Sequence, residues 1–292
     1  MKLAVAVVLV VVLCAAAGLA ALAWRASARA VHPGPASYAW SPTDFPELAA
    51  EEVTVDSSTG ARLAGRFFPG SKRATIVLTH GYRGTQDEML PVAAALHRSG
   101  YTVFTYDTRG CGRSGGEITF GAREQDDLIS VVDHLASRPD VDSEHIGALG
   151  FSMGGATTLL AAARDPRIKA VVADSAWKTA KSWVRPSLRA VFLHPRDHFS
   201  ALSVAFAELR AGVDLDDLRP VDAMRSLQKR PVLLIHGSAD DVVLPADAEA
   251  LAAAHVDAEL WRIEGAAHGA TVEPGGATTS ERVAQFFERA LS

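Results

Sequence analysis

The sequence predicts an α/β fold in which one mostly parallel sheet is covered by helices on both faces. From Glu51 onward, short runs rich in β-branched and aromatic residues alternate with longer helix-prone runs. Such alternation is typical of parallel strands joined by helices. The 292 residues suffice for one large domain of this class or two small ones. A serine flanked by glycines stands where an apolar run meets a helix-prone run, at Gly150–Gly155.

The N-terminal segment predicts a transmembrane helix over residues 1–24. Leu3 to Trp24 holds no charged residue, and these 22 residues can cross a bilayer core, which needs about 20. The alternative is a cleaved signal peptide, because Ala26-Ser27-Ala28 has the small residues that a signal peptidase requires. The apolar stretch exceeds the usual signal-peptide core of roughly 7–15 residues, which favours a retained anchor.

Residues 25–48 contain four prolines and predict a linker that holds the following domain off the membrane. Basic residues lie on both sides of the apolar segment, at Lys2 and at Arg25 and Arg29, so the charge bias for orientation is weak. We expect the domain, residues 49–292, to lie outside the cytoplasm at the cell membrane. Secretion after cleavage is the alternative.

Apolar runs with β-branched and aromatic residues predict eight strands: 53–55, 63–68, 74–79, 101–106, 145–150, 168–173, 231–236 and 259–263. The turn Ser58-Thr59-Gly60 joins the first two as a hairpin. Amphipathic or alanine-rich runs predict helices over 89–98, 122–137, 156–163, 247–255 and 279–291. Residues from about 175 to 220 fit neither strand nor short loop and predict a small helical cap.

The stretch Gly150-Phe151-Ser152-Met153-Gly154 has the form of a nucleophile elbow, a sharp strand-to-helix turn with serine at its apex. The serine must adopt a strained backbone, and the residues two before and two after it then crowd together. Glycine at both places meets that demand. A glycine-rich turn carrying an idle serine is the alternative interpretation.

A serine hydroxyl needs a base, and the base needs an orienting carboxylate. Asp240 follows the strand 231–236, and His268 lies in a loop of small residues after the last predicted strand. The spacing from Gly237 favours Asp240 over its neighbour Asp241 as the acid. The predicted catalytic residues are therefore Ser152, Asp240 and His268.

Two backbone N–H groups are expected to form the oxyanion hole, because they are fixed dipoles that need no reorganisation. One belongs to Met153, directly after the serine, and the other to Tyr82 in the loop after the strand 74–79. His80 is interpreted as a buried hydrogen-bonding residue and His236 as packing at the end of a strand.

No metal, cofactor or nucleic-acid partner is expected. Spacings such as C-x-x-C and H-E-x-x-H do not occur, and the net charge of −5 includes no basic run. Gly110 to Gly115 fits G-x-G-x-x-G, but a dinucleotide site needs that run to open a helix directly. Further glycines intervene here, so we interpret the run as a structural turn.

In the predicted cap, Trp177 and Trp183 are candidate substrate-binding residues that would line an acyl pocket. Packing of the cap against the domain explains either side chain equally well.

Four stretches taken together, 79–81, 107–114, 150–155 and 236–240, resemble the α/β-hydrolase superfamily over about residue 50 to the end. The chain is similar to membrane-anchored serine hydrolases related to bacterial esterases, monoacylglycerol lipases and the catalytic domains of prolyl-oligopeptidase-type peptidases. The resemblance implies hydrolysis of an ester, thioester or amide through an acyl-enzyme, without a cofactor. It places the triad on Ser152, Asp240 and His268, and the oxyanion donors on Tyr82 and Met153.

We therefore expect a serine esterase that acts on small or lipid-like acyl esters. A peptidase or amidase of the same fold is the first alternative, although the extra domain common in such peptidases is missing. A non-catalytic, membrane-tethered scaffold is the second. The physiological substrate, its acyl chain length and the oligomeric state stay open.

Overall fold

A computed structural model describes residues 2–32, 34, 40–183, 200–227, 229–269 and 277–292. Its centre is an eight-stranded sheet with the strand order β1-β2-β4-β3-β5-β6-β7-β8. The strands are β1 Glu51–Asp56, β2 Arg62–Phe68, β3 Thr75–Thr79, β4 Thr102–Tyr106, β5 Ile146–Phe151, β6 Ile168–Asp174, β7 Val232–Gly237 and β8 Glu259–Ile263. β1 and β2 pair antiparallel, as do β2 and β4, and every other pairing is parallel. The predicted fold class is confirmed.

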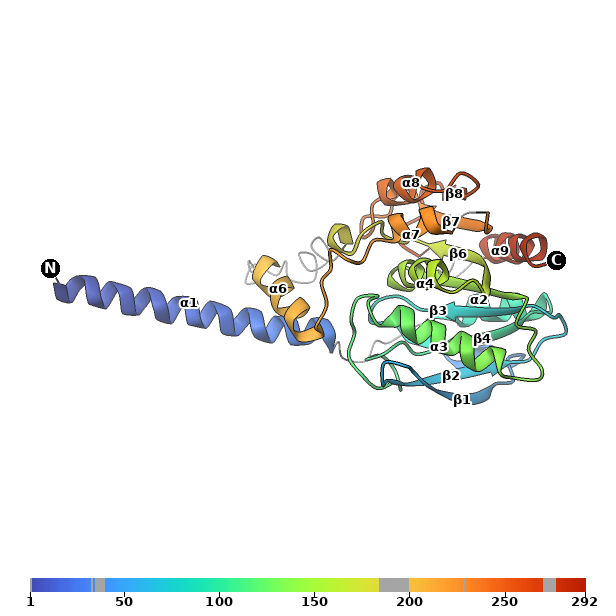
Figure 1. Ribbon diagram of the computed structural model, residues 1–292, viewed down its shortest axis with the longest axis horizontal. Helices are drawn as coiled ribbons and strands as arrows, with labels where there is room; N and C mark the ends of the chain where they lie inside the picture. The colour runs from blue at the N-terminus through green and yellow to red at the C-terminus, as the bar shows by residue number, and fades with distance from the viewer. Residues whose placement is uncertain (1, 33, 35–39, 184–199, 228, 270–276) are drawn as a thin grey trace.

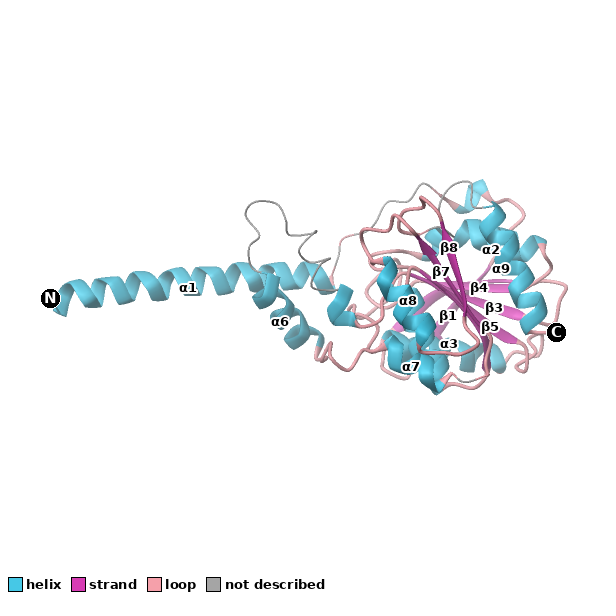
Figure 2. Ribbon diagram, turned by 90° about the horizontal axis from the view of Figure 1, so that it is seen from above, coloured by secondary structure: helices cyan, strands magenta, loops and turns pink. Residues whose placement is uncertain are grey.

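Helices cover both faces of the sheet, as Figure 2 shows. One apolar core lies between the sheet and α2 (Leu90–Arg98) with α9 (Ala277–Ala290). The other lies beneath α3 (Glu124–Ala136), α4 (Met153–Arg164), α7 (Pro220–Ser226) and α8 (Pro245–Ala253). Two short 3-10 turns, η1 (Pro42–Asp44) and η2 (Gln86–Met89), complete this part. Central strands such as β3 are buried throughout, which explains their continuous apolar sequence.

The N-terminal helix α1 (Lys2–Val31) projects from the domain (Figure 1). It is the one helix among the described residues that is long and apolar enough to cross a membrane. Its first part is exposed, whereas Ala23, Ser27, Ala30 and Val31 are buried near its end.

The helix therefore continues through residues 25–31, which the sequence had placed in the linker. The reason is tertiary: the small side chains near its end pack against α6 (Ser200–Ala211), a contact that local composition does not reveal. Of the predicted cap, residues 175–183 and 200–220 are described, the latter including α6, and residues 184–199 lie outside the described part of the chain.

Candidate active site

The turn between β5 and α4 holds Ser152 in a conformation that few non-glycine residues adopt, with φ 53° and ψ −118°. Its N–H donates to the carbonyl oxygen of Asp174 at 2.8 Å. A Cβ added to Gly150 would collide with the carbonyl of Gly154, and one added to Gly154 would collide with the carbonyl of Thr79. Because only glycine fits at both places, the local sequence produces the strained turn that was predicted.

The structure brings Ser152, His268 and Asp240 into one hydrogen-bonded line. Nε2 of His268 lies 2.9 Å from Oγ of Ser152, and Nδ1 lies 2.8 Å from Oδ2 of Asp240. An ionised carboxylate only accepts, so Nδ1 carries the proton and Nε2 is left to accept from the serine hydroxyl. Asp241 is exposed and does not share this line.

Asp240 is held as a carboxylate by four hydrogen bonds. Oδ1 accepts the backbone N–H groups of Val242 and Val243, each at 2.9 Å. Oδ2 accepts from His268 and, at 3.2 Å, from Nε2 of His236. Burial acts to raise the pKa of Asp240, but the hydrogen bonds from the two histidines outweigh it and hold the pKa well below its usual range. The Asp240 carboxyl is therefore ionised when it accepts the hydrogen bond from His268.

The sequence predicted that His236 only packs at the end of a strand. In the structure it also makes two polar contacts. Its Nε2 donates to the carbonyl oxygen of Val243 at 2.8 Å as well as to Asp240. Burial lowers its pKa, and the Asp240 hydrogen bond overcomes this, so the net direction is upward. We interpret His236 as a positioning residue for the carboxylate. The available signal was its spacing, four residues before the acid across a tight turn.

The two expected oxyanion donors lie beside the serine. Met153 is the first residue of α4, where backbone N–H groups have no partner within the helix and attract negative charge. On the other side, a Cβ added to Gly81 would lie 3.4 Å from Cβ of Ser152, so the loop that carries Tyr82 passes directly over the nucleophile.

His80 holds the loop that carries Tyr82 in place through two hydrogen bonds to the backbone. The Thr108 N–H donates to its Nε2 at 2.9 Å, so Nδ1 carries the proton and donates to the Gly81 carbonyl at 2.8 Å. Burial lowers the pKa of His80 and keeps the ring neutral. Its predicted role as a buried hydrogen-bonding residue is confirmed.

Glu88 also anchors the loop, since its Oε2 accepts the Gly81 N–H at 2.8 Å. Burial raises its pKa from 4.5 to about 7, against the opposing effect of that hydrogen bond. The native state therefore binds this proton more tightly than the unfolded chain does. Its contribution to stability is present below pH 4.5 and is lost as the pH rises towards 7.

We expect Glu88→Gln to lose less stability than the wild type when the pH rises from about 5 to about 8. Gln does not titrate, so the difference between the two pH responses isolates this carboxyl, on the order of 1–3 kcal/mol. Thermal unfolding of both proteins at the two pH values measures it. Parallel responses would show that Glu88 has an ordinary pKa.

The glycine run Gly110–Gly115 is a turn folded around a carboxylate. A Cβ on Gly112 would collide with the side chain of Asp107, which accepts the N–H groups of Gln86 at 2.8 Å and Arg113 at 2.9 Å. The next helix, α3, begins only at Glu124, so the run does not open a helix as a dinucleotide site requires. Across the described residues, no cluster of three His, Cys, Asp or Glu side chains is placed to hold a metal.

The two cap tryptophans are packed in the interior. Trp177 is 0% and Trp183 4% exposed, and their rings stack with centroids 6.2 Å apart. Tyr82 meets Trp183 edge-on at 5.3 Å, and all three belong to one apolar cluster with Met153. Contact with substrate stays a prediction for both tryptophans. Their packing joins the cap to the nucleophile turn.

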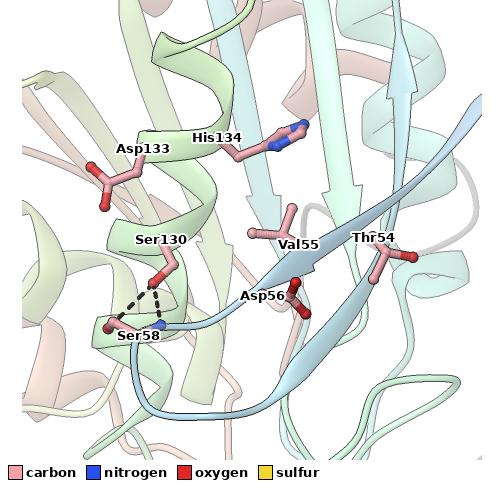
Figure 3. A pocket seen from close by; sticks show the side chains of 7 residues that line it. All are labelled: Thr54, Val55, Asp56, Ser58, Ser130, Asp133 and His134. Atoms are coloured by element: carbon pink, nitrogen blue, oxygen red, sulfur yellow. Dashed lines mark hydrogen bonds between the residues drawn. The ribbon is translucent and has the colours of Figure 1, made fainter.

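A separate hollow lies between β1 and α3 (Figure 3), lined by Thr54, Val55, Asp56, Ser58, Ser130, Asp133 and His134. Within it, the Ser58 N–H donates to Oγ of Ser130 at 3.0 Å. Because β1 is the edge strand and three strands separate it from β5, this hollow is not part of the serine site.

Comparison with known proteins gives matches of sequence and of structure. Residues 67–209 match the family described as X-Pro dipeptidyl-peptidase (S15 family). An uncharacterised 31.7 kDa protein of the traX-finO intergenic region of Escherichia coli is 36% identical over 124 residues, which are 41% of this chain and 43% of that protein. The uncharacterised protein YfhR of Escherichia coli K12 is 29% identical over 204 residues, 67% of this chain and 64% of YfhR. The matches therefore span less than two thirds of these relatives.

The Pyrococcus furiosus esterase Pf2001 superposes with a TM-score of 0.73 and 26% identity, covering 90% of this chain and 98% of the esterase. This agreement extends over nearly the whole molecule. The chain therefore has the α/β-hydrolase fold and is similar, in sequence and in structure, to hydrolases of that superfamily.

Proposed function

We propose that the protein is a serine esterase that hydrolyses carboxylic esters through an acyl-enzyme. The observation that carries the proposal is the line of hydrogen bonds from Ser152 through His268 to Asp240, at 2.9 and 2.8 Å. These separations lie in the range that proton transfer between a nucleophile and its base requires.

In the proposed reaction, Oγ of Ser152 attacks the ester carbonyl carbon while its proton passes to Nε2 of His268. The Asp240 carboxylate stabilises the imidazolium that forms. The backbone N–H groups of Met153 and Tyr82 hold the oxyanion of the tetrahedral intermediate. His268 then gives its proton to the leaving alcohol as the carbon–oxygen bond breaks, and water repeats the sequence on the acyl-serine.

Ester hydrolysis is favoured over peptide hydrolysis by the similarity to a named esterase over 98% of its length. The peptidase alternative has its own support, because residues 67–209 match the X-Pro dipeptidyl-peptidase family. Ser152, His268 and Asp240 suit both reactions, so the choice between ester and peptide depends on which substrate binds beside Ser152.

A panel of short acyl p-nitrophenyl esters and aminoacyl p-nitroanilides separates the two reactions. We expect the best ester to exceed the best amide in kcat/KM by about 100-fold or more, a difference in transition-state stabilisation near 3 kcal/mol. Comparable values, or a preference for an X-Pro amide, would establish the peptidase instead.

The esters are proposed to be lipid-like because α1 would tether the enzyme to a membrane. Its buried end supports a retained anchor over a cleaved signal peptide. Ala26-Ser27-Ala28 lies inside the helix, and Ser27 is 0% exposed where this end of the helix packs against α6. We propose that the domain lies on the extracytoplasmic side.

A non-catalytic scaffold has less support. Positive φ at a serine costs on the order of 1–3 kcal/mol, and a scaffold gains nothing from keeping that strain.

A further inference from the structure

We propose that the exposed face of α6, together with Trp24, is a membrane-contact surface that lies in the headgroup region of the bilayer crossed by α1. The partner is the lipid surface itself, and the inference rests on the membrane anchor of the proposed function. The domain is then held against the membrane, rather than away from it as the linker interpretation implied.

The depth of α6 follows from its contacts with α1. The apolar segment Leu3–Trp24, at about 1.5 Å per residue, is about 33 Å long and so matches a hydrocarbon core of about 30 Å. Trp24 therefore marks the boundary with the headgroups, where tryptophan is enriched. Phe206 of α6 contacts the Trp24 ring edge-on at 5.5 Å, which places α6 at this boundary.

The two helices are fixed to each other by close packing. Small side chains are buried on both: Ala23, Ser27 and Ala30 on α1, and Ser203, Val204, Ala207 and Ala211 on α6. Arg210 lies over the Trp24 ring at 3.9 Å and donates to Oγ of Ser27 at 3.3 Å. Figures 1 and 2 both show α6 beside the domain-proximal end of α1. A rigid joint of this kind keeps α6 at one depth.

The outer face of α6 is apolar. Leu202 is 40% and Leu209 70% exposed, and their separation of seven residues places them on the same side of the helix. Glu208, which precedes Leu209 in the sequence, accepts the Leu215 N–H at 3.2 Å. Exposed apolar side chains next to a membrane-spanning helix are suited to lipid, and Arg25 and Arg29 supply cations for anionic headgroups.

The same joint reaches the serine site. The Tyr82 hydroxyl donates to the carbonyl oxygen of Ala30 at 2.8 Å, which links the end of α1 to the oxyanion loop. Met153, Trp183 and the inner side of α6 share one apolar cluster. This cluster therefore connects the inner side of α6 to the residue that follows Ser152. The substrate class that fits is a glycerolipid acyl ester presented by the membrane.

The first test places an environment-sensitive fluorophore on Leu209→Cys in the full-length chain carrying Cys14→Ser, reconstituted in phosphatidylcholine–phosphatidylglycerol vesicles. Val256→Cys is the matched control, because Val256 is 95% exposed and lies between α8 and β8. We expect a blue-shifted emission at position 209 that headgroup-level nitroxide lipids quench, and a water-like emission at position 256. Water-like emission at both positions would overturn the surface. Disulfide-linked dimers of the unlabelled Leu209→Cys variant, together with no lipid quenching of the labelled one, would also overturn it and would assign the face to a second copy.

The second test compares Leu209→Glu with Val256→Glu. We expect Leu209→Glu to slow hydrolysis of monooleoylglycerol in vesicles about tenfold while turnover of a soluble short-chain ester is unchanged. Val256→Glu should change neither. Equal rates of vesicle hydrolysis in the two variants would contradict the inference. A wild type inactive on the soluble ester would defeat the esterase proposal alone, since the fluorescence at position 209 reports the surface without any turnover.

Discussion

Replacing Ser152 with alanine is expected to lower kcat for a short p-nitrophenyl ester by about 10⁶-fold and to abolish labelling by a fluorophosphonate probe. The reason is covalent: without Oγ there is no atom for His268 to deprotonate and none to carry the acyl group. A smaller rate above the uncatalysed reaction should survive, because the backbone N–H groups of the oxyanion hole do not depend on the serine side chain.

Two controls make this result specific. Ser99→Ala changes an exposed serine at the end of α2 and should leave rate and labelling as in the wild type. Thermal unfolding of Ser152→Ala should show an intact fold, because alanine keeps the Cβ and removes only a hydroxyl. Probe labelling that persists in Ser152→Ala would remove the serine-hydrolase assignment of this site.

Replacing Asp240 with asparagine is expected to lower kcat by about 10⁴-fold with little change in KM. Asp240 accepts four hydrogen bonds, from Val242, Val243, His236 and His268. An asparagine amide must turn its NH₂ towards one pair of these donors. The imidazole then loses either its orientation or the tautomer with the proton on Nδ1, and the growing positive charge loses its partner.

Asp241→Asn is the matched control, because it makes the same chemical change one residue away on an exposed side chain. We expect it to retain wild-type kcat. The pair is compared by steady-state kinetics on one soluble ester across pH. A large decrease in kcat for Asp241→Asn and a small one for Asp240→Asn would assign the acid role to Asp241. That result would contradict the observed line of hydrogen bonds.

Much of the fold could be predicted because its determinants are local. The apolar runs and the turn residues between them predicted eight strands. The bounds of each predicted strand lie within a few residues of the observed bounds. The turn at Ser152 could also be predicted from the sequence. Gly150 and Gly154 are required there because a Cβ at either position would collide with a backbone carbonyl group. Burial on both faces explains why central strands were recognisable as unbroken apolar runs.

What only the tertiary structure decided depends on residues far apart in the chain. Sequence spacing favoured Asp240, but its contact with His268, 28 residues later, is what separates it from Asp241. The role of His236 required the turn that returns Asp240 to the end of β7. The extent of α1 was set by packing against α6, more than 170 residues away, which no local propensity encodes. Local sequence determines which helices and strands form. The pairing of distant side chains, and the position of α6 beside α1, arise only when distant segments pack into one interior.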